Sequence, residues 1–180
     1  MTGVPASRLA HGISAETPDW SREAKAFLQW APSRSLLAAL RGYQRATSRR
    51  GPLAALRRRW AVLRHRFWSI VTGADIPIGC RIGGGLIMPH PNGIVIHPAV
   101  ESGPNCLIMQ QVTLGVAGRN RGVPRIGGHV DISVGASILG PVRIGDHAVI
   151  GAHALVIDDV PAGAVMVSPR ARIKADVKVD

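Results

Sequence analysis

Two residues near the middle of the sequence, Asp75 and His90, have side chains that could act together in proton transfer. A carboxylate beside an imidazole fixes the imidazole tautomer and stabilises the imidazolium that forms when histidine takes a proton. A hydroxyl group needs such a base to attack, because an alcohol is a weak nucleophile at neutral pH. Such a pair could support general-base chemistry on a hydroxyl if the fold brings the two side chains together, and otherwise Asp75 is a capping residue at the entrance of the repeats and His90 an exposed turn residue.

Other residues of chemical interest divide into anion-binding candidates and residues with no ligand pattern. Arg119, Arg121 and Arg125 could hold a phosphate or carboxylate through bidentate hydrogen bonds, and a solvated loop explains them equally well. Four further histidines lack metal-ligand spacing, and two cysteines stand at positions typical of small apolar core residues: His97, His129, His147, His153, Cys80 and Cys106. We therefore expect no metal site and no disulfide.

The element that must position these residues shows a six-residue period. Apolar residues stand six apart in two runs, interrupted between Gly115 and Arg125: Ile76, Ile82, Met88, Ile94, Val100, Cys106 and Val112, then Ile126, Ile132, Ile138, Ile144, Ile150 and Val156. This period predicts a parallel β-helix, in which short strands form coils that bury their core only by stacking. A β-sandwich would show two-residue alternation instead. We expect about four coils of about eighteen residues, with residues 115–125 extruded as a loop.

The same period predicts where the candidate pair lies. Asp75 directly precedes the repeat that begins at Ile76, and His90 lies in the repeat of Met88, on the third side of the same coil. The next coil begins at Ile94. The two residues should therefore lie near one corner, on adjacent coils.

The first 72 residues have a different character. They hold 13 Lys and Arg against 3 Asp and Glu, whereas residues 73–180 hold 9 against 8. Helical signals predict helices over about 17–30, 35–48 and 52–73, and the third has apolar residues at helical spacing with arginines on its other faces: Leu56, Trp60, Leu63, Phe67 and Ile70. This basic arm could pack on the end of the β-helix, and it also suits peripheral contact with an anionic membrane. No nucleic-acid motif accompanies it, which argues against nucleic acid as a partner.

Three stretches of the repetitive region resemble one known family. They read GADIPIGCRIGGGLIMPHPNGIVIHPA, QQVTLG and IGGHVDISVGASILGPVRIGDHAVIGAHALVIDDVPAG, and the likeness extends over about residues 73–172. They resemble bacterial serine acetyltransferases and related hexapeptide-repeat O-acetyltransferases. The resemblance implies a mainly β fold, a left-handed parallel β-helix, with Asp75 and His90 as the catalytic pair and His90 as general base.

The resemblance further implies acetyl-CoA as acyl donor, without a metal, and a homotrimer. The pantetheine arm would lie along the coil edge, and the candidates for the cofactor site are Gly115, Arg125, Gly135, Ala136, Gly151 and Ala152. Arg119 and Arg121 are candidates for contact with the substrate from the loop.

Departures from the family pattern concern the acceptor. Pro89 stands where serine acetyltransferases typically carry an acidic residue, and Gly122 and Val123 precede Pro124 where those enzymes resemble one another in carrying Arg-His. An amino acid bound there would lack charged partners. The sequence around Pro89 is also more similar to exopolysaccharide-associated O-acetyltransferases. The predicted acceptor is therefore a saccharide or another small hydroxyl compound. The alternatives are a serine O-acetyltransferase of cysteine biosynthesis and a non-catalytic scaffold.

The predicted organisation is a basic helical arm over 1–72, a β-helix over 73–172 and a tail over 173–180. The start of the sequence lacks the apolar run of a signal peptide, and no stretch approaches the roughly 20 apolar residues of a membrane span. We therefore expect a cytoplasmic protein.

Overall fold

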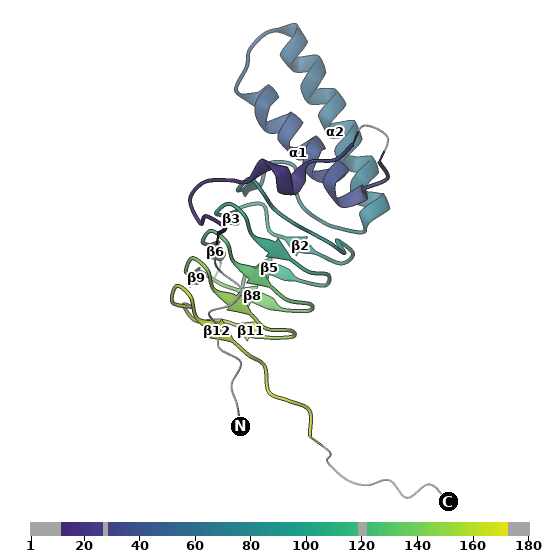
Figure 1. Cartoon of the computed structure of the whole chain (residues 1–180). Coiled ribbons are helices and arrows are strands. Elements are labelled where there is room, and N and C mark those ends of the chain that lie inside the picture. The colour runs from purple at the N-terminus through teal and green to yellow at the C-terminus, as the bar shows by residue number, and fades with distance from the viewer. Residues whose placement is uncertain (1–11, 27–28, 119–121, 173–180) are drawn as a thin grey trace, which may run out of the picture.

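The computed structural model describes residues 12–26, 29–118 and 122–172. Two helices form an arm at one end of a prism of short parallel strands, and the coils of the prism stack away from the arm (Figure 1). The prediction of a mainly β, left-handed parallel β-helix with a helical arm is confirmed. Among the described residues, no helix is long and apolar enough to cross a membrane.

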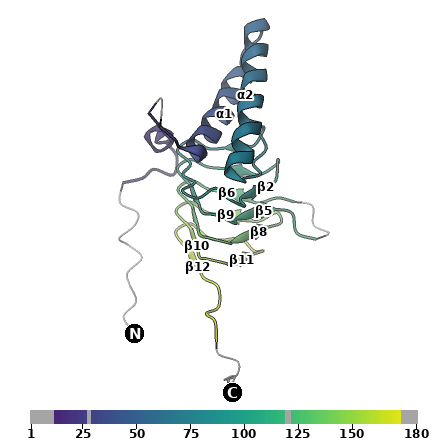
Figure 2. The same ribbon diagram turned by 90° about the vertical axis from the view of Figure 1, so that its right-hand side faces the viewer.

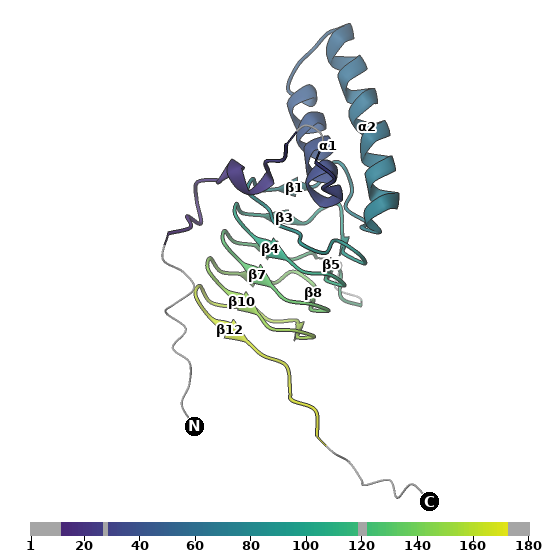
Figure 3. The same cartoon turned by 45° about the vertical axis from the view of Figure 1, so that its right-hand side comes forward.

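The prism has three parallel sheets of four strands, one on each side (Figure 3). The β1 sheet contains β1 (Arg81–Ile82), β3 (Glu101–Ser102), β6 (Arg125–Ile126) and β9 (Arg143–Ile144). The β4 sheet contains β4 (Leu107–Ile108), β7 (Asp131–Ile132), β10 (Val149–Ile150) and β12 (Val165–Met166). The β2 sheet contains β2 (Val95–Ile96), β5 (Thr113–Gly115), β8 (Ser137–Leu139) and β11 (Leu155–Val156).

The prism interior is filled by two kinds of apolar residue. One points inward from most of the strands, such as Ile96 and Ile132, and the other fills a corner of the coil, such as Ala136 and Ala148. All four are at most 2% exposed. Small residues at the corners let the chain turn without leaving a void, which is why this core needs few aromatic rings.

The strand register shows that the coils are not equal in length. Later partners such as Arg125 and Arg143 are 18 positions apart, but Arg81 and Glu101 in the first coil are 20 apart. The apolar residues from Ile76 to Val112 stand six apart, but they do not keep one position in the coil, because two extra residues lie between Met88 and Ile94. The six-residue spacing of apolar residues is still unbroken, because Met88 points inward before the extra residues, Ile94 fills a corner after them, and both are apolar.

The coil that contains the interruption at Gly115 is longer again. Thr113 and Ser137 are partners 24 positions apart, so this coil has six residues more than an 18-residue coil. The extra residues lie between β5 and β6, and the chain leaves the prism after β5 and returns to it at β6 (Figure 2). Residues 119–121 of this loop lie outside the described part of the chain.

The arm consists of α1 (Pro32–Thr47) and α2 (Pro52–Thr72), each with proline in its first turn. This proline costs no hydrogen bond, because the first N–H groups of a helix have no partner within it. Gly73 ends α2 in the left-handed conformation, with φ of 65°. Leu36, Leu37 and Leu40 of α1 join the hydrophobic core above the first coil.

The helix predicted over 17–30 is wrong for the described residues of that segment. Only η2 (Trp20–Glu23), a single 3-10 turn, forms there, with the Asp19 side chain accepting from the Ser21 N–H. The segment before it lies along the prism, where the Asn105 side chain donates to Ser14 and Thr17 carbonyls and accepts from the Asp19 N–H. These long-range hydrogen bonds hold the chain extended against its local helical preference.

Candidate active site

Asp75 is positioned by the junction between α2 and the prism. Its N–H donates to the carbonyl of Ile94 at 2.8 Å, and its carbonyl accepts from the N–H of Ile96 at 2.9 Å. Asp75 thus pairs with Val95 and extends the β2 sheet by one level toward the arm. Its side chain is exposed.

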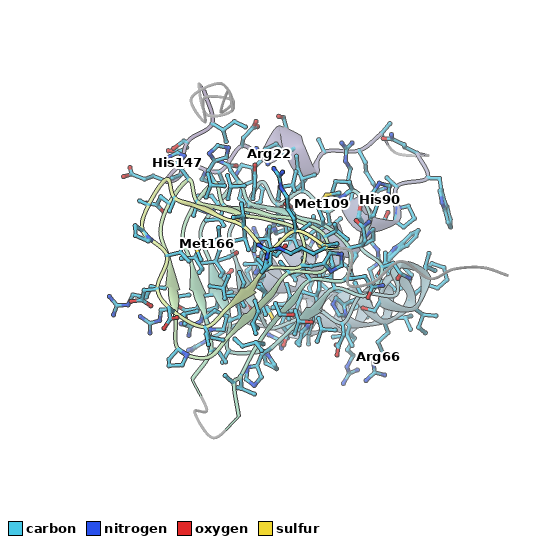
Figure 4. The ribbon with its side chains drawn as sticks, turned by 90° about the horizontal axis from the view of Figure 1, so that it is seen from below. Arg22, Arg66, His90, Met109, His147 and Met166 are labelled. Carbon is cyan, nitrogen blue, oxygen red and sulfur yellow. The ribbon has the colours of Figure 1, made fainter. Side chains whose placement is uncertain are left out.

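His90 lies within the two-residue interruption of the first coil. The Gly93 N–H donates to the Gly73 carbonyl, and the Gln111 N–H donates to the Asn92 carbonyl, so Asn92 and Gly93 follow the regular stacking. The two extra residues must therefore precede Asn92, where Pro89 and His90 are both exposed. The interruption carries the imidazole outward from the corner, and Figure 4 shows His90 at the rim of the prism.

The structure brings Asp75 and His90 to the same corner of adjacent coils. Asp75 stands beside Val95 on the β2 sheet, and His90 lies in the turn that leads into that strand. Within the described chain, no hydrogen bond or ion pair joins the two side chains. Their arrangement allows a shared role at one corner, and the assignment of that role remains a proposal.

His65 is a residue that the sequence reasoning missed. It lies on α2, half-buried, and its Nε2 atom is 2.8 Å from the carbonyl oxygen of Ile76. Burial lowers the pKa of His65, while the hydrogen bond to Ile76 and the charge of Asp75 oppose that effect. His65 thus joins α2 to the first coil next to the candidate pair. Its place on the buried side of α2, seven residues before Thr72 and four after Ala61, is the signal that could have identified it.

The candidates for the cofactor site fall at two places. Gly115 ends β5 and Arg125 begins β6, so they flank the extruded loop, whereas Arg119 and Arg121 lie outside the described residues. Arg125 is exposed and lines a groove of about 510 Å³ together with Arg143. The end of the loop at Arg125 therefore meets a groove on the β1 sheet that also carries Arg143 and Glu101.

The two Gly-Ala pairs are not equivalent in the structure. Gly135 adopts φ of 68°, and a methyl group added there would meet the ring of His153 one coil further on. Ala136 is fully buried, whereas Ala152 is exposed. A methyl group added at Gly151 would lie 2.7 Å from the Met166 carbonyl oxygen. Coil stacking thus explains both glycines, and of the four residues only Ala152 offers an open edge.

The remaining titratable residues lie elsewhere. His129 and His147 stack on the opposite corner, with their Nδ1 atoms 2.8 Å apart. In the part of the chain that the structure describes, no group of three or more His, Cys, Asp or Glu could hold a metal ion. Burial raises the pKa of Cys80 and Cys106 to about 11, so neither thiol is ionised at neutral pH.

Known proteins similar to this chain in sequence and in fold are serine acetyltransferases. A serine acetyltransferase of Helicobacter pylori is 38% identical over 104 residues, which is 57% of this chain and 61% of the relative. A serine acetyltransferase structure from Neisseria gonorrhoeae in complex with serine is 34% identical, with a TM-score of 0.59 over 79% of this chain and 55% of that chain. A serine acetyltransferase structure in complex with CoA is 27% identical, with a TM-score of 0.63 over 77% of this chain and 55% of that one.

The fold defines a hexapeptide-repeat protein of the left-handed β-helix class. Within that class, the matched part of the chain is similar to serine acetyltransferases, which confirms the resemblance predicted from the sequence. The chain spans about three fifths of the length of the Helicobacter relative. No model of a known protein family matches the chain.

Proposed function

We propose that the protein is an acetyl-CoA-dependent O-acetyltransferase, and that its acceptor is serine or a closely similar hydroxyl compound. The single observation that carries the proposal is the placement of Asp75 and His90 at one corner of a prism similar to serine acetyltransferases. Relatives in complex with serine and with CoA support the two substrates.

His90 would act as the general base. It takes the proton of the acceptor hydroxyl while the oxygen attacks the thioester carbonyl carbon, and the CoA thiolate that leaves recovers this proton from the imidazolium. Asp75 would orient the imidazole and stabilise its positive charge. Catalytic hydrogen bonds often tighten only when the substrate binds, so the lack of a hydrogen bond between Asp75 and His90 in the described part of the chain is compatible with these roles.

The donor would lie along the β2 sheet, between the corner of His90 and the extruded loop. Arg125, with Arg119 and Arg121, supplies cations for the CoA phosphates, while Gly115 and the open edge at Ala152 leave room for the pantetheine arm. Gln110, one coil beyond Asn92, supports a ligand at this corner. Its Oε1 atom is buried and has no hydrogen-bond partner among the described residues.

The proposal includes a homotrimer. Asp75 and His90 are both exposed on a single chain, so water would surround the reacting groups. A second copy against the β2 sheet would exclude that water and strengthen the electrostatic contribution of Asp75.

The observations favour different acceptors. Similarity to serine acetyltransferases favours serine over the saccharide predicted from the sequence. Pro89, Gly122 and Val123 favour the saccharide, because none of these side chains can pair with the charges of an amino acid. The saccharide O-acetyltransferase therefore stands as the second candidate.

A thiol-release assay with saturating acetyl-CoA tests the proposal, with L-serine and a panel of saccharides as acceptors. We expect kcat/KM for L-serine of about 10⁴ M⁻¹s⁻¹ or more, as for an efficient enzyme. Release with saccharides alone would replace serine by the second candidate. A folded protein that releases no thiol with any acceptor would be a scaffold, and the proposed activity would be wrong.

A further inference from the structure

Helix α2 has two apolar faces, of which only one is covered. The inner face includes Ala54 and Ala61, which are 5% exposed. The outer face carries six large apolar residues, each between 55 and 84% exposed: Leu53, Leu56, Trp60, Leu63, Phe67 and Ile70. These six recur at spacings of three and four, which places them in one stripe along the helix. We call them the outer stripe.

The charges beside the outer stripe all have one sign. Residues 32–72 contain ten arginines and no lysine, aspartate or glutamate. At 100° per residue, Arg57 and Arg64 lie on one side of the stripe, and Arg59 and Arg66 lie on the other. Arg66 points away from the molecule in Figure 4. An apolar stripe bordered on both sides by arginines therefore faces outward.

A groove between the two helices has the same chemistry. Its volume is about 270 Å³, and alanines of both helices form its floor. Arg45 and Arg49 of α1 and Arg57 and Arg64 of α2 line it together with Trp60. An apolar floor among four guanidinium groups suits a molecule that has both an apolar chain and an anionic head.

Two other occupants of the outer stripe conflict with these charges. A second copy of the arm would bring ten more arginines against the first ten, without a carboxylate between residues 32 and 72 to pair with them. Nucleic acid would neutralise the arginines but leave six large apolar side chains in water. We propose that the outer stripe and the groove bind the surface of an anionic lipid bilayer.

In this arrangement α2 lies in the plane of the membrane surface. The outer stripe enters the boundary between headgroups and acyl chains, and the arginines on both sides contact lipid phosphates. The arm extends beyond the first coil (Figure 2), so the prism would remain in water with the corner of His90 accessible. This inference does not depend on the proposed acetyl transfer.

The test is sedimentation of the full chain with two kinds of vesicle, phosphatidylcholine alone and phosphatidylcholine with about a third phosphatidylglycerol. We expect at least about tenfold tighter binding to the anionic vesicles, weakened by added salt. The double variant Trp60→Ser/Leu63→Ser should lose at least about tenfold in affinity. Val167→Ser, a change at a 76% exposed residue beyond β12, should bind as the unchanged protein does.

A second pair of variants tests the charges. Arg57→Gln/Arg64→Gln should bind anionic vesicles more weakly, whereas Arg170→Gln, at an exposed residue far from the arm in the chain, should not. Equal binding to both vesicle types, or full binding by either double variant, would overturn the proposal. A fall in the oligomeric mass of Trp60→Ser/Leu63→Ser in light scattering would also overturn it, because a second copy of the chain would then cover the stripe.

Discussion

Arg41 of α1 and Glu23 of η2 form an ion pair of 2.8 Å in which both side chains are less than a tenth exposed. The Arg41 guanidinium also donates to the carbonyl oxygens of Ile82 and Gly83 in the first coil. Glu23 accepts in addition from the Leu86 N–H. One arginine thus joins η2, α1 and the prism, and without it the Glu23 carboxylate would lose its countercharge and the Ile82 and Gly83 carbonyls would lose a donor.

Arg41→Ala should lower the free energy of unfolding by about 3–5 kcal/mol, because it leaves the buried Glu23 carboxylate without a countercharge and with only the Leu86 N–H as a hydrogen-bond donor. Guanidinium unfolding followed by circular dichroism measures this change. The matched control is Arg81→Ala, which breaks an ion pair of equal length with Glu101 whose side chains are 82% and 43% exposed. It should cost less than about 1 kcal/mol. Equal effects of the two variants would contradict the role given to Arg41.

His90→Ala should lower kcat by about 10²–10⁴, the usual contribution of a positioned general base, and leave acetyl-CoA binding largely unchanged. Asp75→Asn should have a smaller effect, since it changes only the orientation and charge of the surroundings. Steady-state kinetics with the acceptor that supports thiol release provides the measurement. His147→Asn, at the opposite corner of the prism, is the control. Near-full activity of His90→Ala would assign the base to another residue.

The partly buried His129 should make stability depend on pH. Burial lowers the pKa of His129, and the charges of His147 and Arg22 act in the same direction, against that of Asp131. Because the folded protein binds a proton at His129 less readily than the unfolded chain, stability is full above pH of about 6.5 and falls as the pH drops toward the folded pKa.

His129→Asn should reduce this loss of stability, since asparagine tolerates the φ of 51° at this position and does not titrate. Thermal midpoints at about pH 7.5 and 5.5 measure the difference. A residual dependence should remain from His65, whose pKa is also lowered by burial. An unchanged pH dependence in the variant would show that His129 does not carry the effect.

Gly103→Ala should destabilise the prism by about 1–3 kcal/mol, because the added methyl group would lie 2.5 Å from the backbone nitrogen of Gly128. Neither backbone can move without separating two hydrogen-bonded coils. Gly79→Ala is the control, since a methyl group there meets nothing within 4 Å. Urea unfolding should therefore distinguish the two glycines, and similar midpoints would mean that the coils can separate at little cost.

The sequence predicts the prism well because its period is a local property. Most coils repeat an alternation of an inward apolar residue and a buried apolar corner residue, and Ile126 to Val156 keep one phase in the structure. The two-residue interruption at Pro89 and His90 could not be read from the period. Met88 and Ile94 are both apolar, so a change from inward to corner position leaves the apolar beat intact.

The arm and the candidate site depend on contacts that a local pattern does not contain. Asn105 holds Ser14 and Thr17 across about 90 positions of sequence, which prevents the helix predicted there. The shared corner of Asp75 and His90 could be predicted, because it follows from the number of strands in a coil. The hydrogen bond from His65 to the first coil could not, since it depends on how α2 meets the prism.

The two departures from the 18-residue coil lie on either side of the β2 sheet, one at His90 and one at the extruded loop. A regular solenoid has translational symmetry, so a ligand sliding along its surface would meet the same environment at every level. The two departures break that symmetry at fixed heights, one before β2 and one after β5, so these two levels of the sheet differ from the levels that follow. Inserting or deleting a whole coil beyond β8 would lengthen or shorten the β2 sheet and leave the two irregular levels unchanged.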